Sequence, residues 1–95
     1  MTNQSALHVL VVGHVQGVFY RATTRSIAHD MGLRGWVRNL PNGQVELLAL
    51  GEEKDLRAFL HYCQEGPPNA KVEELRTRWL APEDCENIPR GFEIR

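Results

Sequence analysis

Residues Leu7 to Met31 have the sequence LHVLVVGHVQGVFYRATTRSIAHDM, and their hydrophobic period changes once along this length. Apart from His8, Leu7 to Val12 consists of β-branched and other aliphatic residues, which is typical of a strand buried in the middle of a sheet. From Tyr20 onward the apolar side chains recur at helical spacing, so that one helical face carries Tyr20, Thr24, Ile27, Ala28 and Met31. We therefore expect a central strand that ends at Gly13, a loop, and an amphipathic helix that ends at Gly32.

The next segment predicts a β-hairpin. Gly35 to Leu40 (GWVRNL) has the composition of a second strand, which Pro41 ends because proline cannot continue the hydrogen-bonded ladder. The dipeptide Asn42-Gly43 is the strongest turn signal in the chain, and Gln44 to Leu50 is expected as the return strand.

The remainder of the chain predicts a second helix and two more strands. The helix is indicated by apolar residues at i, i+3, i+4 and i+7 and by the break at Gly66-Pro67-Pro68; its apolar residues are Leu56, Phe59, Leu60 and Cys63. Glu74 to Leu80 alternates between apolar or neutral residues and arginines, as a strand with one wet face does. A polar loop then leads to a short final strand that contains Phe92 and Ile94.

The predicted order is strand–helix–strand twice, followed by the short extra strand. This is the order of the ferredoxin-like α+β sandwich (βαββαβ), with two helices on one face of an antiparallel four-stranded sheet, here extended by a fifth strand. The first and second strands of this topology are parallel, with the third between them, so their C-terminal ends lie at the same edge. We expect residues 1–95 to form a single domain with Trp36 and Trp79 in its core.

The composition narrows the classes of function. With 42% hydrophobic and 24% charged residues the chain is typical of soluble globular proteins, and its net charge of −1 gives no basic field for nucleic acid. No apolar run is long enough to span a bilayer, and the N-terminus lacks the layout of a secretory signal. Cys63 and Cys85 have no metal-ligand spacing. They are expected to be reduced thiols of a cytoplasmic protein, although the sequence also allows one bridge between them.

The loop GHVQGVFYR, Gly13 to Arg21, has the features of an anion site. Gly13 and Gly17 allow a tight turn whose N–H groups can converge on an anion, and the following helix directs its positive end to the same place. Arg21 adds a planar guanidinium that matches two phosphate oxygens. The loop is neither a Walker loop nor a dinucleotide fingerprint. The alternative is that the glycines only shape the turn and Arg21 is solvated.

Asn39 ends the second predicted strand and therefore lies at the same sheet edge as this loop. A carboxamide accepts and donates hydrogen bonds without ionising, so it can orient a water molecule near a bound phosphate. The alternative is an ordinary turn residue before Leu40-Pro41.

These motifs, with GLRGWVRN at Gly32 to Asn39 and NGQVE at Asn42 to Glu46, closely resemble the acylphosphatase family. The resemblance covers nearly the whole chain, including its FEIR ending. It implies that Arg21 binds the phosphoryl group, that Asn39 orients the attacking water, and that the phosphate is held by a loop of Gly13, His14, Val15, Gln16, Gly17, Val18 and Phe19. The family often has phenylalanine where this chain has Tyr20, and we assign its hydroxyl no role.

The resemblance implies an enzyme that hydrolyses the carboxyl–phosphate bond of acyl phosphates to a carboxylate and inorganic phosphate. No metal or cofactor is expected, because no histidine has a partner at metal-ligand spacing and phosphoryl transfer of this kind needs mainly positioning. We expect a cytoplasmic monomer with no nucleic-acid or membrane partner. The main rival is a domain of a larger protein that binds carbamoyl or acetyl phosphate. An RNA-binding module is disfavoured, because the central strands lack aromatic residues.

Overall fold

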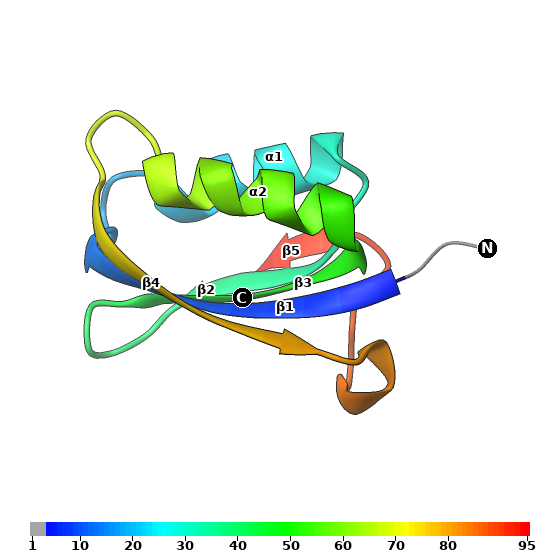
Figure 1. Cartoon of the computed structure of the whole chain (residues 1–95). Helices are drawn as coiled ribbons and strands as arrows, with labels where there is room; N and C mark the ends of the chain where they lie inside the picture. Colours follow the sequence, from blue (N-terminus) through cyan, green and yellow to red (C-terminus); the bar gives the residue numbers. More distant parts are fainter. Residues whose placement is uncertain (1–3) are drawn as a thin grey trace.

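A five-stranded sheet covered on one face by two helices forms the protein in a computed structural model, which describes residues 4–95 (Figure 1). The elements in chain order are β1 (Gln4–His14), α1 (Tyr20–Asp30), β2 (Arg34–Asn39), β3 (Val45–Glu52), α2 (Glu53–Glu65), β4 (Lys71–Leu80), the 3-10 helix η1 (Pro82–Asp84) and β5 (Phe92–Ile94). This arrangement confirms the predicted ferredoxin-like α+β class.

The strand order β4-β1-β3-β2-β5 places β1 in the middle of the sheet. Both β1 and β2 pair antiparallel with β3, so they run parallel to each other on its two sides, as predicted. Val45 of β3 lies opposite Val11 on one side and opposite Asn39 on the other. Asn39 therefore ends β2 at the level where β1 approaches the glycine-containing loop.

The C-terminal strand β5 joins the outer edge of β2 in parallel, which makes the sheet mixed. Val37 lies opposite Ile94, and the Arg95 N–H donates to the Val37 carbonyl over 2.8 Å. This pairing brings the last residues of the chain close to the end of β2.

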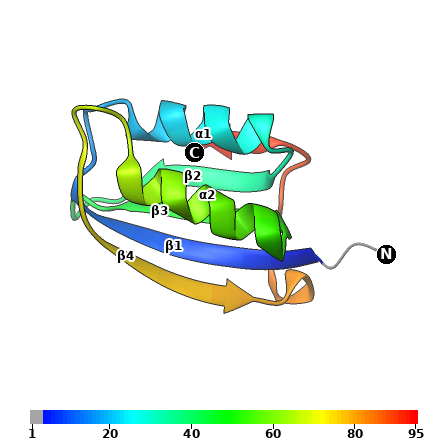
Figure 2. The same ribbon diagram turned by 45° about the horizontal axis from the view of Figure 1, so that its top comes forward.

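The core lies between the sheet and the helices. Helix α1 covers β2 and β5, and α2 covers β1 and β3 (Figure 2). Phe59 of α2 packs edge-to-face on Phe92 of β5, with 6.1 Å between the ring centroids. The covered sheet face is aliphatic and consists of Leu7, Val9, Val11, Val37, Val45, Leu47 and Ala49.

The prediction that both tryptophans lie in the core is wrong. Val37 points to the helices, so strand alternation directs Trp36 to the opposite face, where it is half-buried. The guanidinium groups of Arg38 and Arg95 lie 5.2 and 5.4 Å from its ring centre. Trp79 is 38% exposed because β4 is an edge strand with one neighbour. A local pattern of alternation does not distinguish an edge strand from a central one.

Both cysteines are free thiols, so the bridge that the sequence allowed is not formed. Cys63 is buried on α2, and this burial raises the pKa of its thiol to about 12. Among residues 4–95, no helix is long and apolar enough to cross a membrane.

Candidate active site

A pocket of about 290 Å³ opens where β1 and β2 end. It joins four parts of the fold: the loop after β1, the first turn of α1, the end of β2 and strand β5. Its lining residues are Val15, Gly17, Phe19, Tyr20, Arg21, Ala22, Asn39 and Ile94. Both residues predicted to be catalytic, Arg21 and Asn39, therefore face the same cavity.

The two glycines of the loop have different structural roles. Gly13 lies at a β-bulge, has φ 139°, and approaches β4 so closely that a Cβ would collide with the Lys71 carbonyl. Gly17 lines the pocket with φ 76° and has open space around it. Gly13 is thus required by strand packing, and only Gly17 shapes the turn at the pocket.

The N-terminus of α1 faces the pocket with unpaired backbone donors. Phe19 is the N-terminal cap residue, and no side chain caps the helix. The Thr23 N–H donates to the Phe19 carbonyl over 3.0 Å, so the three preceding N–H groups have no acceptor within the helix. The first turn also carries no acidic residue. These donors and the helix dipole favour an anion at this position.

Arg21 provides a positive charge that no carboxylate neutralises. It is the second residue of α1, is half-buried and lines the pocket. Across residues 4–95, no acidic side chain forms a salt bridge with its guanidinium. The guanidinium is therefore available to bind an anion that enters the pocket.

Asn39 provides a buried acceptor that receives no hydrogen bond. Its Oδ1 atom is almost completely buried and has no hydrogen-bond partner in the described part of the chain. Leaving a buried acceptor unsatisfied costs about 1–3 kcal/mol, and such groups are rare. A donor molecule bound in the pocket, such as water, would satisfy this atom.

Gln16 connects the loop to the β2–β3 hairpin. Its side-chain Nε2 donates to the Leu40 carbonyl over 2.8 Å and to the Gln44 carbonyl over 2.9 Å. Both donor hydrogens are thus used within the protein, and Gln16 does not line the pocket. The contact of Gln16 with substrate stays a prediction, and it now concerns only the backbone N–H of this residue.

Tyr20 places its ring at the pocket wall and its hydroxyl in the interior. The hydroxyl donates to the Cys63 carbonyl at the end of α2 over 2.6 Å. Residue 67 is proline and has no N–H, so the usual helical donor to that carbonyl is missing. Burial raises the pKa of Tyr20 far above its ordinary value, and the hydroxyl stays protonated.

Several other predicted loop residues lie outside the pocket lining. His14 is exposed at the end of β1, and Val18 is buried in the core. Sequence reasoning missed Ala22 and Ile94. Ala22 follows Arg21 in the helix and could have been found from that position, whereas Ile94 reaches the pocket only through the parallel pairing of β5 with β2.

No three His, Cys, Asp or Glu side chains within residues 4–95 are grouped to hold a metal ion. The pocket lining likewise contains no histidine, lysine or carboxylate. The fold and pocket together define a ferredoxin-like α+β protein whose anion site consists of backbone N–H groups, one arginine and one asparagine.

Comparison with known proteins gives the family. The acylphosphatase family model matches residues 7–94. An acylphosphatase of Haloarcula marismortui is 46% identical over 88 residues, which cover 93% of this chain and 92% of that protein. The structure of an acylphosphatase from Coxiella burnetii has a TM-score of 0.87 and 39% identity, with 98% of this chain and 94% of that chain covered. The chain therefore belongs to the acylphosphatase family.

A similar domain also occurs in a much larger protein. The structure of T. kodakarensis HypF has a TM-score of 0.80 and 32% identity to this chain. The match covers 96% of this chain but only 12% of that one.

Proposed function

We propose that this hydrolase acts on acyl phosphates, with Arg21 binding the phosphoryl group and Asn39 orienting the attacking water. One observation carries the assignment. Asn39, whose buried Oδ1 has no partner within residues 4–95, lines the same pocket as Arg21, which forms no salt bridge there, and the uncapped end of α1. An acceptor for a water molecule and a site for an anion are thus combined in one cavity.

The phosphoryl group is held by Arg21 and by backbone N–H groups. The guanidinium donates two parallel hydrogen bonds to phosphoryl oxygens, and the free N–H groups of the first turn of α1 add further donors. These donors are fixed before substrate binds, so they stabilise charge on the phosphoryl oxygens in the transition state without reorganising.

The water attacks in line with the leaving carboxylate. Its oxygen forms a bond to phosphorus while the bond between phosphorus and the carboxyl oxygen breaks, and that bonding electron pair leaves with the carboxylate. Oδ1 of Asn39 accepts a hydrogen bond from the water and fixes its orientation. The water's proton passes to a phosphoryl oxygen of the substrate, since the lining residues include no side chain that can act as a base near neutral pH.

Hydrolysis of benzoyl phosphate, followed by phosphate release with and without a chelator, tests this proposal. We expect release of inorganic phosphate at the same rate in both conditions, because no step requires a metal or an organic cofactor. Absence of hydrolysis would refute the activity. Activity that the chelator removes would refute the metal-free mechanism.

We also propose that residues 1–95 act as one domain, which the single core supports, and that this domain is a monomer in the cytoplasm, where free thiols are the usual state of cysteine. The likeness to a small part of HypF supports a second candidate, a domain that binds an acyl or carbamoyl phosphate without turnover. Saturable binding of acetyl phosphate with no phosphate release would favour this candidate.

A further inference from the structure

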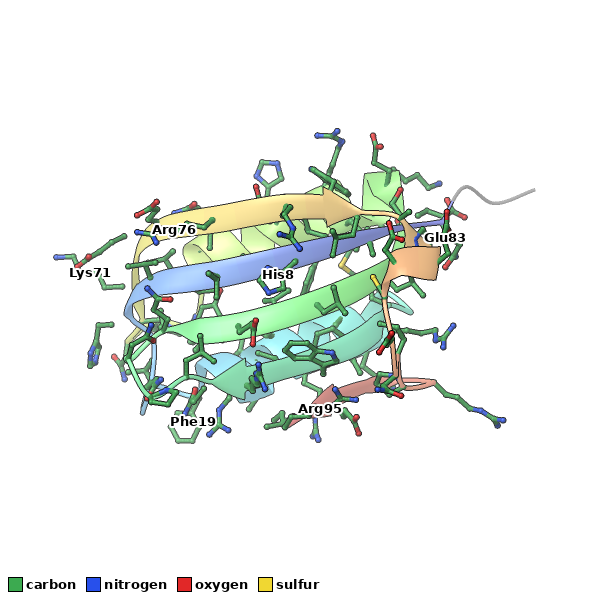
Figure 3. The ribbon with its side chains drawn as sticks, turned by 90° about the horizontal axis from the view of Figure 1, so that it is seen from below. His8, Phe19, Lys71, Arg76, Glu83 and Arg95 are labelled. Atoms are coloured by element: carbon green, nitrogen blue, oxygen red, sulfur yellow. The ribbon has the colours of Figure 1, made fainter. Side chains whose placement is uncertain are left out.

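Two of the most exposed large hydrophobic side chains border the candidate active site. The described chain has four such residues, Phe19, Tyr62, Trp79 and Ile94. Phe19 and Ile94 line the pocket, although one immediately precedes α1 and the other lies in the last strand, β5. Figure 3 shows Phe19 projecting outward near the end of β2, on the side of the molecule where β5 runs.

Phe19 is unfavourable for the folded chain in two respects. Its side chain is 79% exposed, so the ring contributes little to the core. Its φ of 65° is in the left-handed region, which bulky L-residues rarely adopt and which is strained for them. The folded chain therefore gains little stability from this aromatic side chain, which is left exposed at the pocket where a ligand could contact it.

The position of these residues in the pocket matches the leaving part of an acyl phosphate. Among the lining residues, Val15 is buried and so is Oδ1 of Asn39. Phe19, Ala22 and Ile94 are the exposed apolar residues of the lining. In-line attack requires the acyl group to point away from the water at Asn39, and we expect it to leave the pocket past these exposed residues.

We propose that Phe19, Ala22 and Ile94 form an acyl-group site that selects substrates with apolar, and especially aromatic, acyl groups over acetyl phosphate. The proposal rests on the function proposed above. All three side chains are apolar, so the site recognises the size and hydrophobicity of the acyl group and makes no hydrogen bonds to it. Phe19 and Ile94 are specificity-determining residues, because each loses water-exposed apolar surface only when the acyl group is large enough to reach it.

The test compares kcat/KM for benzoyl phosphate with kcat/KM for acetyl phosphate and uses the ratio of the two. We expect Phe19→Asn and Ile94→Ala each to lower this ratio roughly fivefold or more. Asparagine tolerates the left-handed backbone of residue 19, so the substitution removes the ring without forcing a new loop conformation. Phe19→Leu is expected to restore most of the ratio, since it returns an apolar side chain.

Tyr62→Ala is the matched control, because Tyr62 is 49% exposed on α2 and does not line the pocket. The ratio of the two kcat/KM values in Tyr62→Ala should equal that of the unchanged chain. An equal loss on both substrates in Phe19→Asn and Ile94→Ala, or an unchanged ratio in both variants, would overturn the proposal.

A binding measurement separates this inference from the proposed function. Calorimetric titration with phenylphosphonate and methylphosphonate should show tighter binding of the phenyl compound, and the preference should shrink in both variants. If the unchanged chain hydrolyses neither acyl phosphate but retains this preference, the proposed function fails and the acyl-group site stands. Equal affinity for the two phosphonates would refute the acyl-group site.

Discussion

The side chains of Arg21 and Asn39 each have a group that has no partner in the described part of the chain. The Arg21 guanidinium has no carboxylate partner within residues 4–95, and the buried Oδ1 of Asn39 accepts no hydrogen bond there. A bound acyl phosphate would pair with the guanidinium, and a water molecule would donate a hydrogen bond to Oδ1. Replacing Arg21 should therefore weaken binding of the phosphoryl group, whereas replacing Asn39 should disturb the position of the nucleophile.

Replacing Arg21 by lysine tests the geometry of its side chain. Lysine keeps the charge but cannot donate two parallel hydrogen bonds to a phosphoryl group, so we expect kcat/KM for benzoyl phosphate to fall about 100-fold or more. The kcat/KM of Arg21→Ala for the same substrate should fall at least as far. Activity of Arg21→Lys within tenfold of the unchanged enzyme would indicate that a point charge suffices.

Replacing Asn39 by alanine tests its action on water. We expect kcat to fall on the order of 100-fold, while the inhibition constant for inorganic phosphate changes only a few-fold. Steady-state kinetics with phosphate as a competitive inhibitor give both quantities. Comparable losses in kcat and in phosphate affinity would contradict the role of Asn39 in orienting water.

The meeting of Arg21 and Asn39 in one pocket could be predicted from the sequence because it follows from local motifs and one topology. The hydroxyl of Tyr20 could not, since its role depends on Cys63, which is 43 positions away, and on the proline at residue 67. The position of Ile94 also depends on a distant pairing. Residues whose roles come from non-local contacts leave no signal in a local pattern.

At the scale of elements, the site depends on how the loop after β1 is attached to the β2–β3 hairpin. Gln16 makes this connection through the Leu40 and Gln44 carbonyls, on either side of the turn that follows Asn39. The sequence pattern predicted β1, β2 and both helices correctly because each has a clear hydrophobic period. It did not predict that β5 would pair with β2, because three residues carry too little pattern to specify a partner.

Gln16→Met should loosen this connection. Methionine has a similar length but no N–H donors, so the Leu40 and Gln44 carbonyls each lose one hydrogen bond and keep the one from a backbone N–H. The loss of two hydrogen bonds should make unfolding easier by about 1–3 kcal/mol. The kcat for benzoyl phosphate should also fall, because the loop and Asn39 are no longer fixed relative to each other. Urea unfolding and steady-state kinetics measure the two effects. Unchanged kcat with lowered stability would limit Gln16 to a structural role.

The open face of the sheet contains a charged cluster that links three strands. Glu46 of β3 contacts His8 of β1 over 2.8 Å and Arg38 of β2 over 2.6 Å, and its side chain is 16% exposed. His8 is visible on this face in Figure 3. Burial alone would raise the pKa of Glu46, but hydrogen bonds from His8 and Arg38 outweigh it and lower the pKa below the usual 4.5.

A lowered pKa gives Glu46 a stabilising contribution with a defined pH range. The contribution is complete above pH 4.5, where the unfolded chain also has an ionised carboxylate, and it is lost as the pH falls through the lower folded-state pKa. Glu46→Gln should therefore be less stable than the unchanged chain at pH 7, and the difference should shrink toward pH 3. Urea midpoints at several pH values measure this. A difference that is constant with pH would show that the charge of Glu46 is not involved.

At the scale of the whole molecule, the pocket joins residues from Val15 to Ile94, so most of the chain must be folded for the site to exist. The unfolded chain has no such cavity, and phosphate should bind only the native state. Binding at 100 times the dissociation constant then stabilises the fold by about 2.7 kcal/mol. For a domain of this size that corresponds to a rise in Tm on the order of 10 °C.

This rise in Tm separates the two proposed roles without any turnover. Arg21→Ala should lose most of the phosphate-induced rise, because we propose the guanidinium as the main ligand of the anion. Asn39→Ala should keep a rise within a few degrees of that of the unchanged chain, because the role proposed for its carboxamide is to contact water and not the phosphoryl group. Thermal unfolding in phosphate and in sodium chloride of equal ionic strength gives the comparison. If Asn39→Ala loses the rise in Tm as fully as Arg21→Ala does, the asparagine binds the phosphate itself. The separate roles proposed for the two residues would then be wrong.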